Sequence, residues 1–184
     1  DNAKLQWQYD RDQREPAFWL NHRILAYFAV DLYEAWMATE LKGANTYFLP
    51  FNQGSNGAGN DGGAGNPQTK DGDYITSYIW ENVLQKDSLL DIIQKFISFE
   101  VKSEKKNGKN VTKKRLIFPR FHQRDVLHKV LADVYENGST QNYLIQHSAG
   151  SGKTNSIAWL AYRLSSLHDA DNKIIFDNII IVTD

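Results

Sequence analysis

A glycine-containing segment at residues 146–155 (Gln-His-Ser-Ala-Gly-Ser-Gly-Lys-Thr-Asn) constrains the possible fold of this 184-residue chain more than any other feature. A short apolar run at residues 143–145 precedes it and suits a buried strand, and residues 157–164 follow it with apolar side chains at helical spacing. Glycines let the backbone turn its N–H groups inward, and the positive end of the following helix favours an anion at the same place. The segment is therefore predicted to be a phosphate-binding loop between a strand and a helix.

Five consecutive residues of this loop are the predicted nucleotide contacts: Gly150, Ser151, Gly152, Lys153 and Thr154. Lys153 is expected to contact the β- and γ-phosphates, which would be its catalytic contribution, and the Thr154 hydroxyl is expected to hold Mg²⁺. The usual pattern begins with a glycine, and His147 stands in that place. A flexible glycine turn would not explain a Lys-Thr pair at the start of a helix, so ATP with Mg²⁺ is the expected ligand.

The composition excludes several classes of protein. An apolar fraction of 41% with 12% aromatic residues can build a core, which excludes overall disorder. The chain has no cysteine, so disulfides, thiolate metal sites and cysteine nucleophiles are excluded. No apolar run approaches the ~20 residues that a membrane helix needs. The start of the chain lacks Met and a signal-peptide pattern, so we expect a cytoplasmic protein and a piece of something longer.

The charge is unevenly distributed along the chain. Its formal net charge is −1, yet residues 101–124 contain nine Lys or Arg and one Glu. Such a run can face nucleic acid. Because residues 103–110 lack an apolar anchor, we favour a solvated basic linker over residues 101–112, with DNA contact as the alternative.

The first half of the chain shows several local patterns. They predict a helix ending within residues 1–14, strands at 24–30 and 34–39 around a turn at Asp31, and extended structure at 45–51. The tract of Gly and Asn at residues 52–66 cannot pack a core and is predicted to be a long loop, either mobile or wrapped around a ligand.

Helical patterns follow. Residues 75–84 place apolar side chains on one face, and Ser88 is a plausible N-cap for a second stripe at residues 89–97. Residues 124–135 form an amphipathic pattern that stops around Asn137 and Gly138. The β-branched run at 173–182 is predicted to be a second parallel strand, which would complete a right-handed strand–helix–strand unit around the loop.

Two further groups of residues could carry chemistry. Asp31 with Glu40 and Lys42 has the layout of metal-dependent nucleases, in which acids hold a hard cation and a lysine polarises the phosphate. The alternative is an ordinary turn aspartate and a surface Glu-Lys pair. Gln123 enters a helix upstream of the loop, where its amide can bind an adenine edge, as in ATP-driven helicase-type motors. The alternative is an exposed glutamine that begins a helix.

With these motifs in place, the chain resembles the restriction (R) subunit of type I restriction-modification enzymes. The most specific matches are Phe48-Leu-Pro-Phe-Asn52 and Gly63-Ala-Gly-Asn-Pro67, and in this family His147 is the expected residue at its position. The matching blocks span nearly the whole chain: residues 8–16, 26–31, 48–54, 63–67, 83–90, 118–123, 147–154 and 180–184.

The resemblance implies an α/β fold: the end of a nuclease-type α/β domain (residues 1–100, with the loop at 52–73), the basic linker, and the start of a P-loop RecA-like domain with a parallel sheet (residues 113–184). It implies an ATP-dependent translocase and endonuclease that acts on double-stranded DNA together with methylation and specificity subunits. Gln123 matches the glutamine motif of superfamily 2 motors, and Thr183 falls in the motif that borders the DNA.

The resemblance also limits what this piece can do. It places the nuclease acids and the remaining ATPase motifs outside the chain, so the Glu40-Leu41-Lys42 match becomes a coincidence and the piece alone is expected to be inactive. Gln8 and Tyr9 fall near the glutamine–tyrosine pair of the family's nuclease but are adjacent instead of three residues apart. Two alternatives stay open: another superfamily 2 helicase or translocase with an unrelated N-terminal domain, and a binding module that uses the loop at 52–66 and the basic run.

Overall fold

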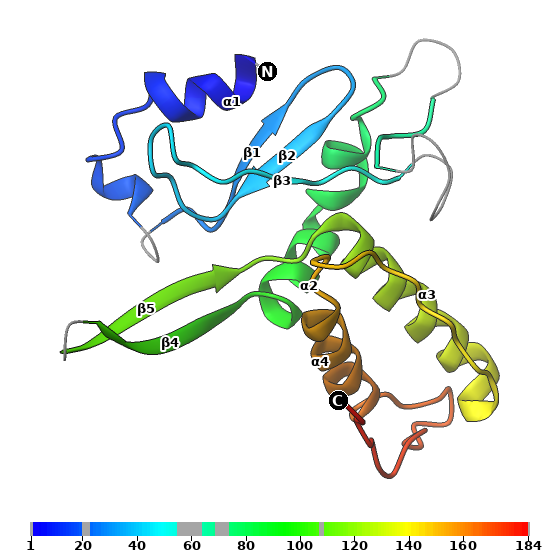
Figure 1. The fold of residues 1–184 in the computed structure, drawn as a ribbon. Helices are drawn as coiled ribbons and strands as arrows, with labels where there is room; N and C mark the ends of the chain where they lie inside the picture. Colours follow the sequence, from blue (N-terminus) through cyan, green and yellow to red (C-terminus); the bar gives the residue numbers. More distant parts are fainter. Residues whose placement is uncertain (1, 20–22, 55–63, 69–73, 107–108, 184) are drawn as a thin grey trace. The chain divides into compact units, whose positions relative to one another are not determined.

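The computed structural model describes the chain except for residues 1, 20–22, 55–63, 69–73, 107–108 and 184. It is a mixed α/β structure with small antiparallel sheets, and it divides into two compact units, Asp1–Arg120 and Phe121–Asp184 (Figure 1). The division falls after Arg120, whereas the resemblance implies a domain that starts at residue 113.

The first unit is built on a three-stranded antiparallel sheet of β1 (Tyr27–Val30), β2 (Ala35–Ala38) and β3 (Leu49–Pro50), in that order. The register pairs Tyr27 with Ala38 and Val30 with Ala35. Asp31 closes the turn, since its Oδ1 accepts the backbone N–H groups of Tyr33 and Glu34, both at 2.8 Å. The predicted hairpin around Asp31 is confirmed.

Aromatic side chains attach the N-terminal helical segment to this sheet. The segment consists of α1 (Asn2–Leu5) and the π-helix η1 (Gln6–Asp10), followed by the short 3-10 helix η2 (Pro16–Phe18). Trp7 packs edge-on against Tyr27 and donates from its indole N–H to the Phe28 carbonyl at 3.0 Å. The predicted helix is therefore present, although it ends at Asp10.

Two asparagines close the glycine-rich tract at its base. Asn52 Oδ1 accepts the Ala35 N–H at 2.8 Å, and Asn66 Oδ1 accepts the Gln53 N–H at 2.8 Å. The Asn66 amide also donates to the Tyr33 carbonyl at 2.9 Å and to Asn52 Oδ1 at 3.1 Å. The described ends of the tract are thus tied to the β1–β2 hairpin, while most of the predicted loop at 52–66 lies outside the described residues.

Replacing Asn66 by alanine is expected to lower the free energy of unfolding of the first unit by about 1–3 kcal/mol, because it leaves the Gln53 N–H and the Tyr33 carbonyl without these partners. Urea denaturation measures the loss. Asn45→Ala, at an exposed asparagine of the same unit, is the matched control and should change stability by less than about 0.5 kcal/mol. Equal stability of the Asn66→Ala and Asn45→Ala variants would contradict this role of the Asn66 hydrogen bonds.

The helices after residue 74 differ in detail from their prediction. They are the π-helix η3 (Ile79–Val83) and α2 (Lys86–Lys95). The wider π-helical turn, closed by the Leu84 N–H on the Ile79 carbonyl at 2.8 Å, buries Ile79 and Val83 and leaves Trp80 and Leu84 exposed. Ser88 is not the N-cap: α2 begins at Lys86, and the Ser88 hydroxyl donates to the Val83 carbonyl at 2.7 Å.

The structure also differs from the predicted linker. The basic run lies in an antiparallel hairpin of β4 (Ser98–Lys106) and β5 (Lys109–Ile117). Pairing between the strands satisfies the backbone N–H and C=O groups without a core. The base of the hairpin is anchored by buried Leu116 and by Phe118, whose ring contacts those of Phe28 and Phe51. Lack of an apolar anchor at residues 103–110 therefore does not prevent regular structure.

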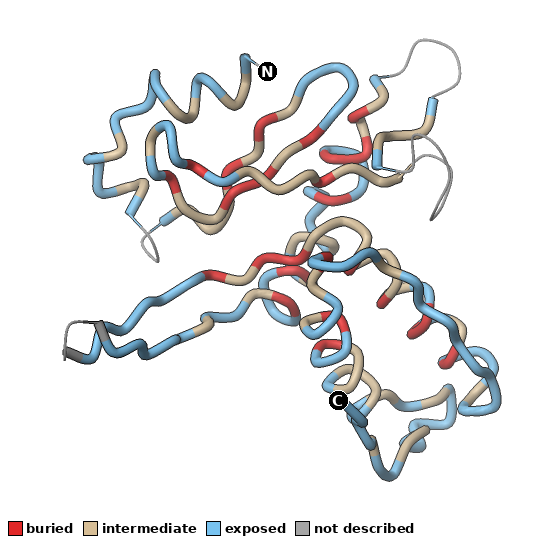
Figure 2. Tube along the Cα trace, in the orientation of Figure 1, coloured by how far each residue is buried: buried red, intermediate tan, exposed pale blue. Residues whose placement is uncertain are grey.

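The second unit pairs two helices, α3 (Phe121–Asn137) and α4 (Lys153–Leu164), joined by the 3-10 helix η4 (Gly138–Thr140) and the loop. The predicted helix at 124–135 and its stop are confirmed, since Gly138 has φ +70°. Figure 2 shows buried positions along α3. The buried residues of the two helices are Gln123, Leu127, Val130, Leu131, Val134, Ser156 and Trp159.

The two predicted strands beside the loop are not strands in this structure. Residues 143–145 have no regular secondary structure, and within 173–182 the described chain forms only an isolated antiparallel bridge between His168 and Ile174. Leu144 is 95% exposed and Val182 is 89% exposed. A β-branched apolar run becomes a strand only when a neighbouring strand completes its backbone bonds, and neither segment has that neighbour here.

Candidate functional site

The loop between residues 146 and 153 has the backbone geometry that an anion-binding turn requires. Gly150 has φ +73° and Gly152 has φ +84°, both in the left-handed region that favours glycine. Helix α4 begins immediately afterwards at Lys153, and no described side chain caps its first turn. The Asn155 N–H donates to the Gly152 carbonyl at 3.1 Å, which leaves the N–H groups of Lys153 and Thr154 at the positive end of α4 available to a ligand.

Lys153 spans the loop. Its Nζ donates to the His147 carbonyl at 3.2 Å, which brings the ammonium group back to the first position of the phosphate-loop pattern. The side chain is exposed, and this bond is a weak one that a phosphate oxygen can replace. Thr154 is also exposed, at the second position of α4. Both predicted ligand contacts are therefore accessible at the start of the helix.

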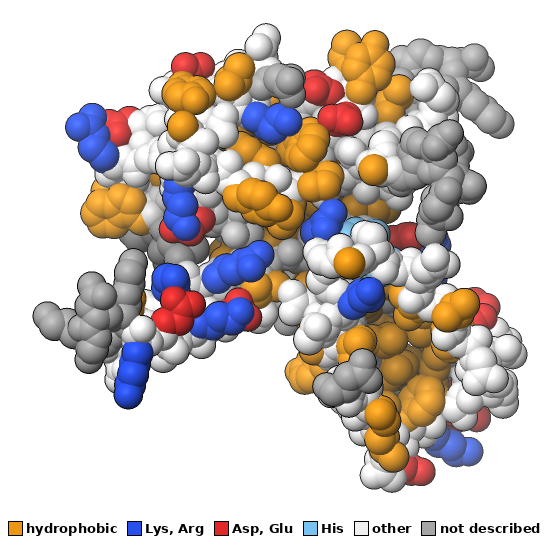
Figure 3. Space-filling view, viewed as in Figure 1, with side chains coloured by type: hydrophobic (Ala, Val, Ile, Leu, Met, Phe, Trp, Pro, Cys, Tyr) orange, Lys and Arg blue, Asp and Glu red, His pale blue; other side chains and the backbone are white. Residues whose placement is uncertain are grey.

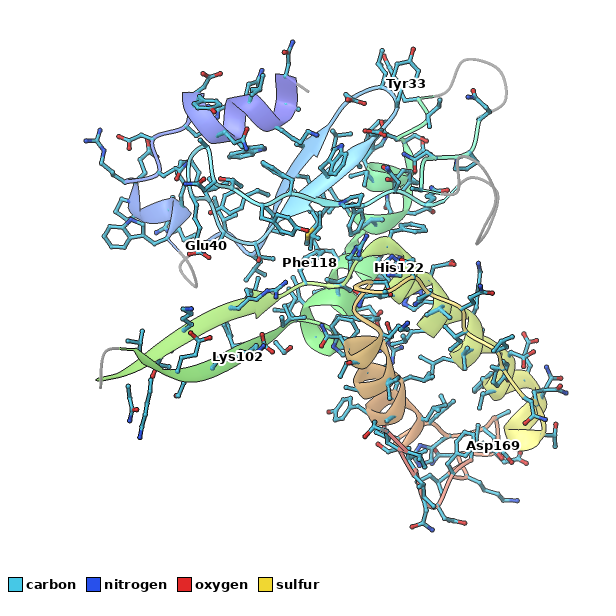
Figure 4. The ribbon with its side chains drawn as sticks, viewed as in Figure 1. Tyr33, Glu40, Lys102, Phe118, His122 and Asp169 are labelled. Carbon is cyan, nitrogen blue, oxygen red and sulfur yellow. The ribbon has the colours of Figure 1, made fainter. Side chains whose placement is uncertain are left out.

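The first turn of α3 holds the loop through two consecutive carbonyl groups. Gln123 Nε2 donates to the Gly152 carbonyl at 2.8 Å, and His122 Nε2 lies 3.1 Å from the Ser151 carbonyl. The His122 ring, labelled in Figure 4, also meets the His147 ring edge-on with 4.7 Å between centroids. Because a carbonyl oxygen accepts, the neutral His122 ring carries its proton on Nε2.

Gln123 packs against the loop backbone. It is 3% exposed, and a Cβ atom added at Gly152 would lie 2.6 Å from its Nε2. The sequence predicts an adenine contact for this amide, and that contact stays a prediction. The support of the loop by Gln123 and His122 was missed, although the position of both residues at the start of α3 and upstream of the loop was visible in the sequence.

The space behind the loop is small and mostly apolar. A cavity of about 100 Å³ lies between α3 and α4, lined by Val126, Leu127, Ile145, Ile157 and Leu160 together with His147, Lys153 and Ser156. The hydroxyl groups of Ser151 and Ser156 are buried without a hydrogen-bond partner in the described structure. The side chain of Ser151, one of the predicted nucleotide contacts, thus faces inward, and a contact of this residue with a nucleotide would be made through its backbone.

The structure does not bring the predicted nuclease residues together. Asp31 follows β1 at the hairpin turn, and Glu40 follows β2 beyond the other end, so the paired strands separate them by more than about 10 Å. Figure 4 shows Tyr33, next to that turn, and Glu40 at opposite ends of the sheet. Lys42 Nζ instead pairs with Glu40 at 2.7 Å. The alternative interpretation, a turn aspartate and a surface Glu-Lys pair, fits this geometry.

The electrostatics of Asp31 agree with a structural role. Burial acts to raise the pKa of its carboxyl group, but the N–H groups of Tyr33 and Glu34, together with nearby positive charge that includes Lys4, hold the pKa below the ordinary value. Among the described residues, no group of three or more His, Cys, Asp or Glu is placed to hold a metal ion. Asp31 therefore stabilises the hairpin turn through its hydrogen bonds to Tyr33 and Glu34.

The other predicted residues lie apart from the loop. Gln8 donates from its amide to the Ala44 carbonyl at 3.4 Å, and Tyr9 is 66% exposed, both within the first unit. Thr183 is exposed near the end of the irregular segment that follows α4. Within the described chain, no helix has both the length and the apolar character of a membrane span.

Comparison of the chain with protein-family models, with curated proteins and with solved structures found no match.

Proposed function

We propose that the second unit binds ATP with Mg²⁺ through the loop at residues 147–154. The main observation in support is that α4 begins with Lys153 and Thr154 directly after a loop with two glycines in the left-handed conformation. The lysine side chain folds back over the loop. A turn of this kind followed by an uncapped helix N-terminus favours a polyphosphate. A structural glycine turn would need neither the exposed lysine nor the exposed threonine.

Each residue has a distinct task in this proposal. The Lys153 ammonium exchanges the His147 carbonyl for β- and γ-phosphate oxygens, and the Thr154 hydroxyl is the protein ligand of the magnesium ion. Gly150, Ser151 and Gly152 supply backbone N–H groups. Gln123 is proposed to contact the adenine, which requires its amide to leave or share the Gly152 carbonyl.

At the level of the whole protein, we propose that this chain is part of the ATP-dependent DNA translocase and endonuclease subunit of a type I restriction enzyme. We propose that this enzyme is located in the cytoplasm. The blocks at residues 48–54, 63–67 and 147–154 support this assignment, as does the order in which they occur. The proposal includes a nuclease-type first domain, a RecA-like second domain, double-stranded DNA near Thr183, and methylation and specificity subunits as partners.

Isothermal titration of the chain with nucleotides tests the binding proposal. ATP with Mg²⁺ is expected to bind at least about tenfold more tightly than AMP, because AMP lacks the phosphates that Lys153 contacts, and one lost charged hydrogen bond costs about 1.5–3 kcal/mol. EDTA should weaken the binding of ATP and leave that of AMP unchanged. Equal affinities for ATP and AMP, or no magnesium dependence, would refute the proposed site.

A further inference from the structure

The β4–β5 hairpin concentrates the positive charge of the chain. Residues 98–117 contain seven Lys or Arg and two Glu, a formal charge of +5, whereas the whole chain carries −1. Every described side chain from Val101 to Arg115 is exposed. Because residues directly opposite one another in an antiparallel pair share a face, the register decides how this charge is divided between the two faces of the hairpin.

One face carries both acids of the hairpin and five of its seven basic residues, with Lys106 opposite Lys109, which gives it a formal charge of +3. The register places Glu100 opposite Arg115, Lys102 opposite Lys113, and Glu104 opposite Val111. Lys102 pairs with Glu100 at 3.2 Å, and Lys113 pairs with Glu104 at 2.8 Å. These ion pairs offset the unfavourable juxtaposition of two lysines. Figure 3 shows acidic and basic side chains beside one another over this hairpin. We call this side the acidic-basic face.

The opposite face has no acid. Along it the register pairs Val101 with Lys114, Ser103 with Thr112, and Lys105 with Asn110. Two ammonium groups, two hydroxyl groups and an amide therefore line one exposed side, and all five can donate hydrogen bonds. Lys105 and Lys114 lie on different strands, separated by about 13 Å along the hairpin at 3.3 Å per residue. We call this side the donor face.

We propose that the donor face binds the sugar-phosphate backbone of double-stranded DNA. Its chemistry is complementary to a row of phosphate oxygens, since it combines lysines and neutral donors and contains no carboxylate to repel them. The separation of its lysines spans about four base-pair steps at 3.4 Å per step. A two-stranded ribbon also has the width that the major groove of DNA admits.

This proposal is independent of the nucleotide site. The hairpin belongs to the first unit, and phosphate contacts by Lys105 and Lys114 require neither ATP nor magnesium. A chain that fails to bind ATP could therefore still bind DNA through the donor face, and the reverse also holds.

The test measures binding of a labelled DNA duplex to the 184-residue chain by fluorescence anisotropy over a range of salt concentrations, without nucleotide. The donor-face variant is Lys105→Gln with Lys114→Gln. Its matched control is Lys102→Gln with Lys113→Gln, which removes the same charge from the acidic-basic face of the same hairpin. All four side chains are exposed, so circular dichroism should show that both variants fold.

The donor-face variant is expected to lower the slope of log K against log salt by about 1.8 and to weaken binding at 0.1 M salt by between about tenfold and a hundredfold. The control should leave the slope unchanged, and Lys105→Arg with Lys114→Arg should retain binding. Equal losses in variant and control would show that only overall charge matters and would overturn the proposal. An unchanged slope in the donor-face variant, or equally tight binding of poly-glutamate, would overturn it as well.

Discussion

Replacement of Gly152 by alanine is expected to abolish ATP binding and to destabilise the second unit by about 2–5 kcal/mol. Two causes add: a left-handed backbone with a Cβ atom costs about 1–2 kcal/mol, and overpacking against a buried side chain costs about 1–3 kcal/mol. The second cause applies because the new Cβ would lie 2.6 Å from Gln123 Nε2. Either the loop or the start of α3 must then move, and the phosphate cradle is lost.

Gly150→Ala is the matched control for this prediction. Gly150 is also left-handed, at φ +73°, but a Cβ atom there would meet no atom within 4 Å. Its expected cost is the backbone term alone, about 1–2 kcal/mol. The difference between the two variants isolates the contact with Gln123. Hydrogen exchange of the amides in α3 and α4 measures both losses specifically in the second unit.

A double variant sharpens the prediction. Gln123→Ala removes the atom that the new Cβ would strike, so combining it with Gly152→Ala should cost about 1–2 kcal/mol less than the sum of the single changes. Strictly additive losses, or equal destabilisation by Gly150→Ala and Gly152→Ala, would show that Gln123 does not support the loop.

The elements that could be predicted from the sequence are those that local interactions specify. The hairpin at Asp31 needs only alternating apolar residues and one carboxylate that accepts two nearby N–H groups. Helix α3 needs its apolar stripe and the stop at Gly138. In both cases, the pattern and its partner lie within a few residues of one another.

The elements that could not be predicted depend on partners far away in the chain. Residues 143–145 and 173–182 have strand composition, but a strand also needs a neighbouring ladder, and most of their apolar side chains remain exposed. The basic run was mistaken for a linker because it lacks a core, although its cross-strand ion pairs and backbone bonds suffice for a hairpin. Composition alone does not reveal such pairings.

The candidate site divides in the same way. The positions of Gly150, Gly152 and Lys153 follow from a contiguous motif, and the structure gives the two glycines a left-handed backbone. The bonds from Gln123 and His122 to the loop carbonyls are tertiary, spanning 29 residues each, and no local pattern specifies them. The sequence therefore identifies the proposed ligand contacts better than the residues that hold them in place.

Replacement of Lys153 by alanine is expected to weaken the binding of ATP with Mg²⁺ by between about tenfold and a hundredfold, because a charged hydrogen bond to phosphate contributes about 1.5–3 kcal/mol. The binding of AMP should hardly change. Stability should change by less than about 0.5 kcal/mol, since the exposed ammonium makes only a long bond to the His147 carbonyl. This separation of binding from stability distinguishes Lys153→Ala from Gly152→Ala.

Lys173→Ala is the matched control, because it removes the same charge from another exposed position of the second unit. Titration calorimetry on both variants, with ATP and AMP in parallel, gives the comparison directly. If Lys173→Ala weakened ATP binding as much as Lys153→Ala did, the effect would come from the general field of the unit. If the contact is local, only the replacement of Lys153 should weaken ATP binding. Lys153→Arg, which keeps the charge on a bulkier planar group, should then restore the affinity only in part.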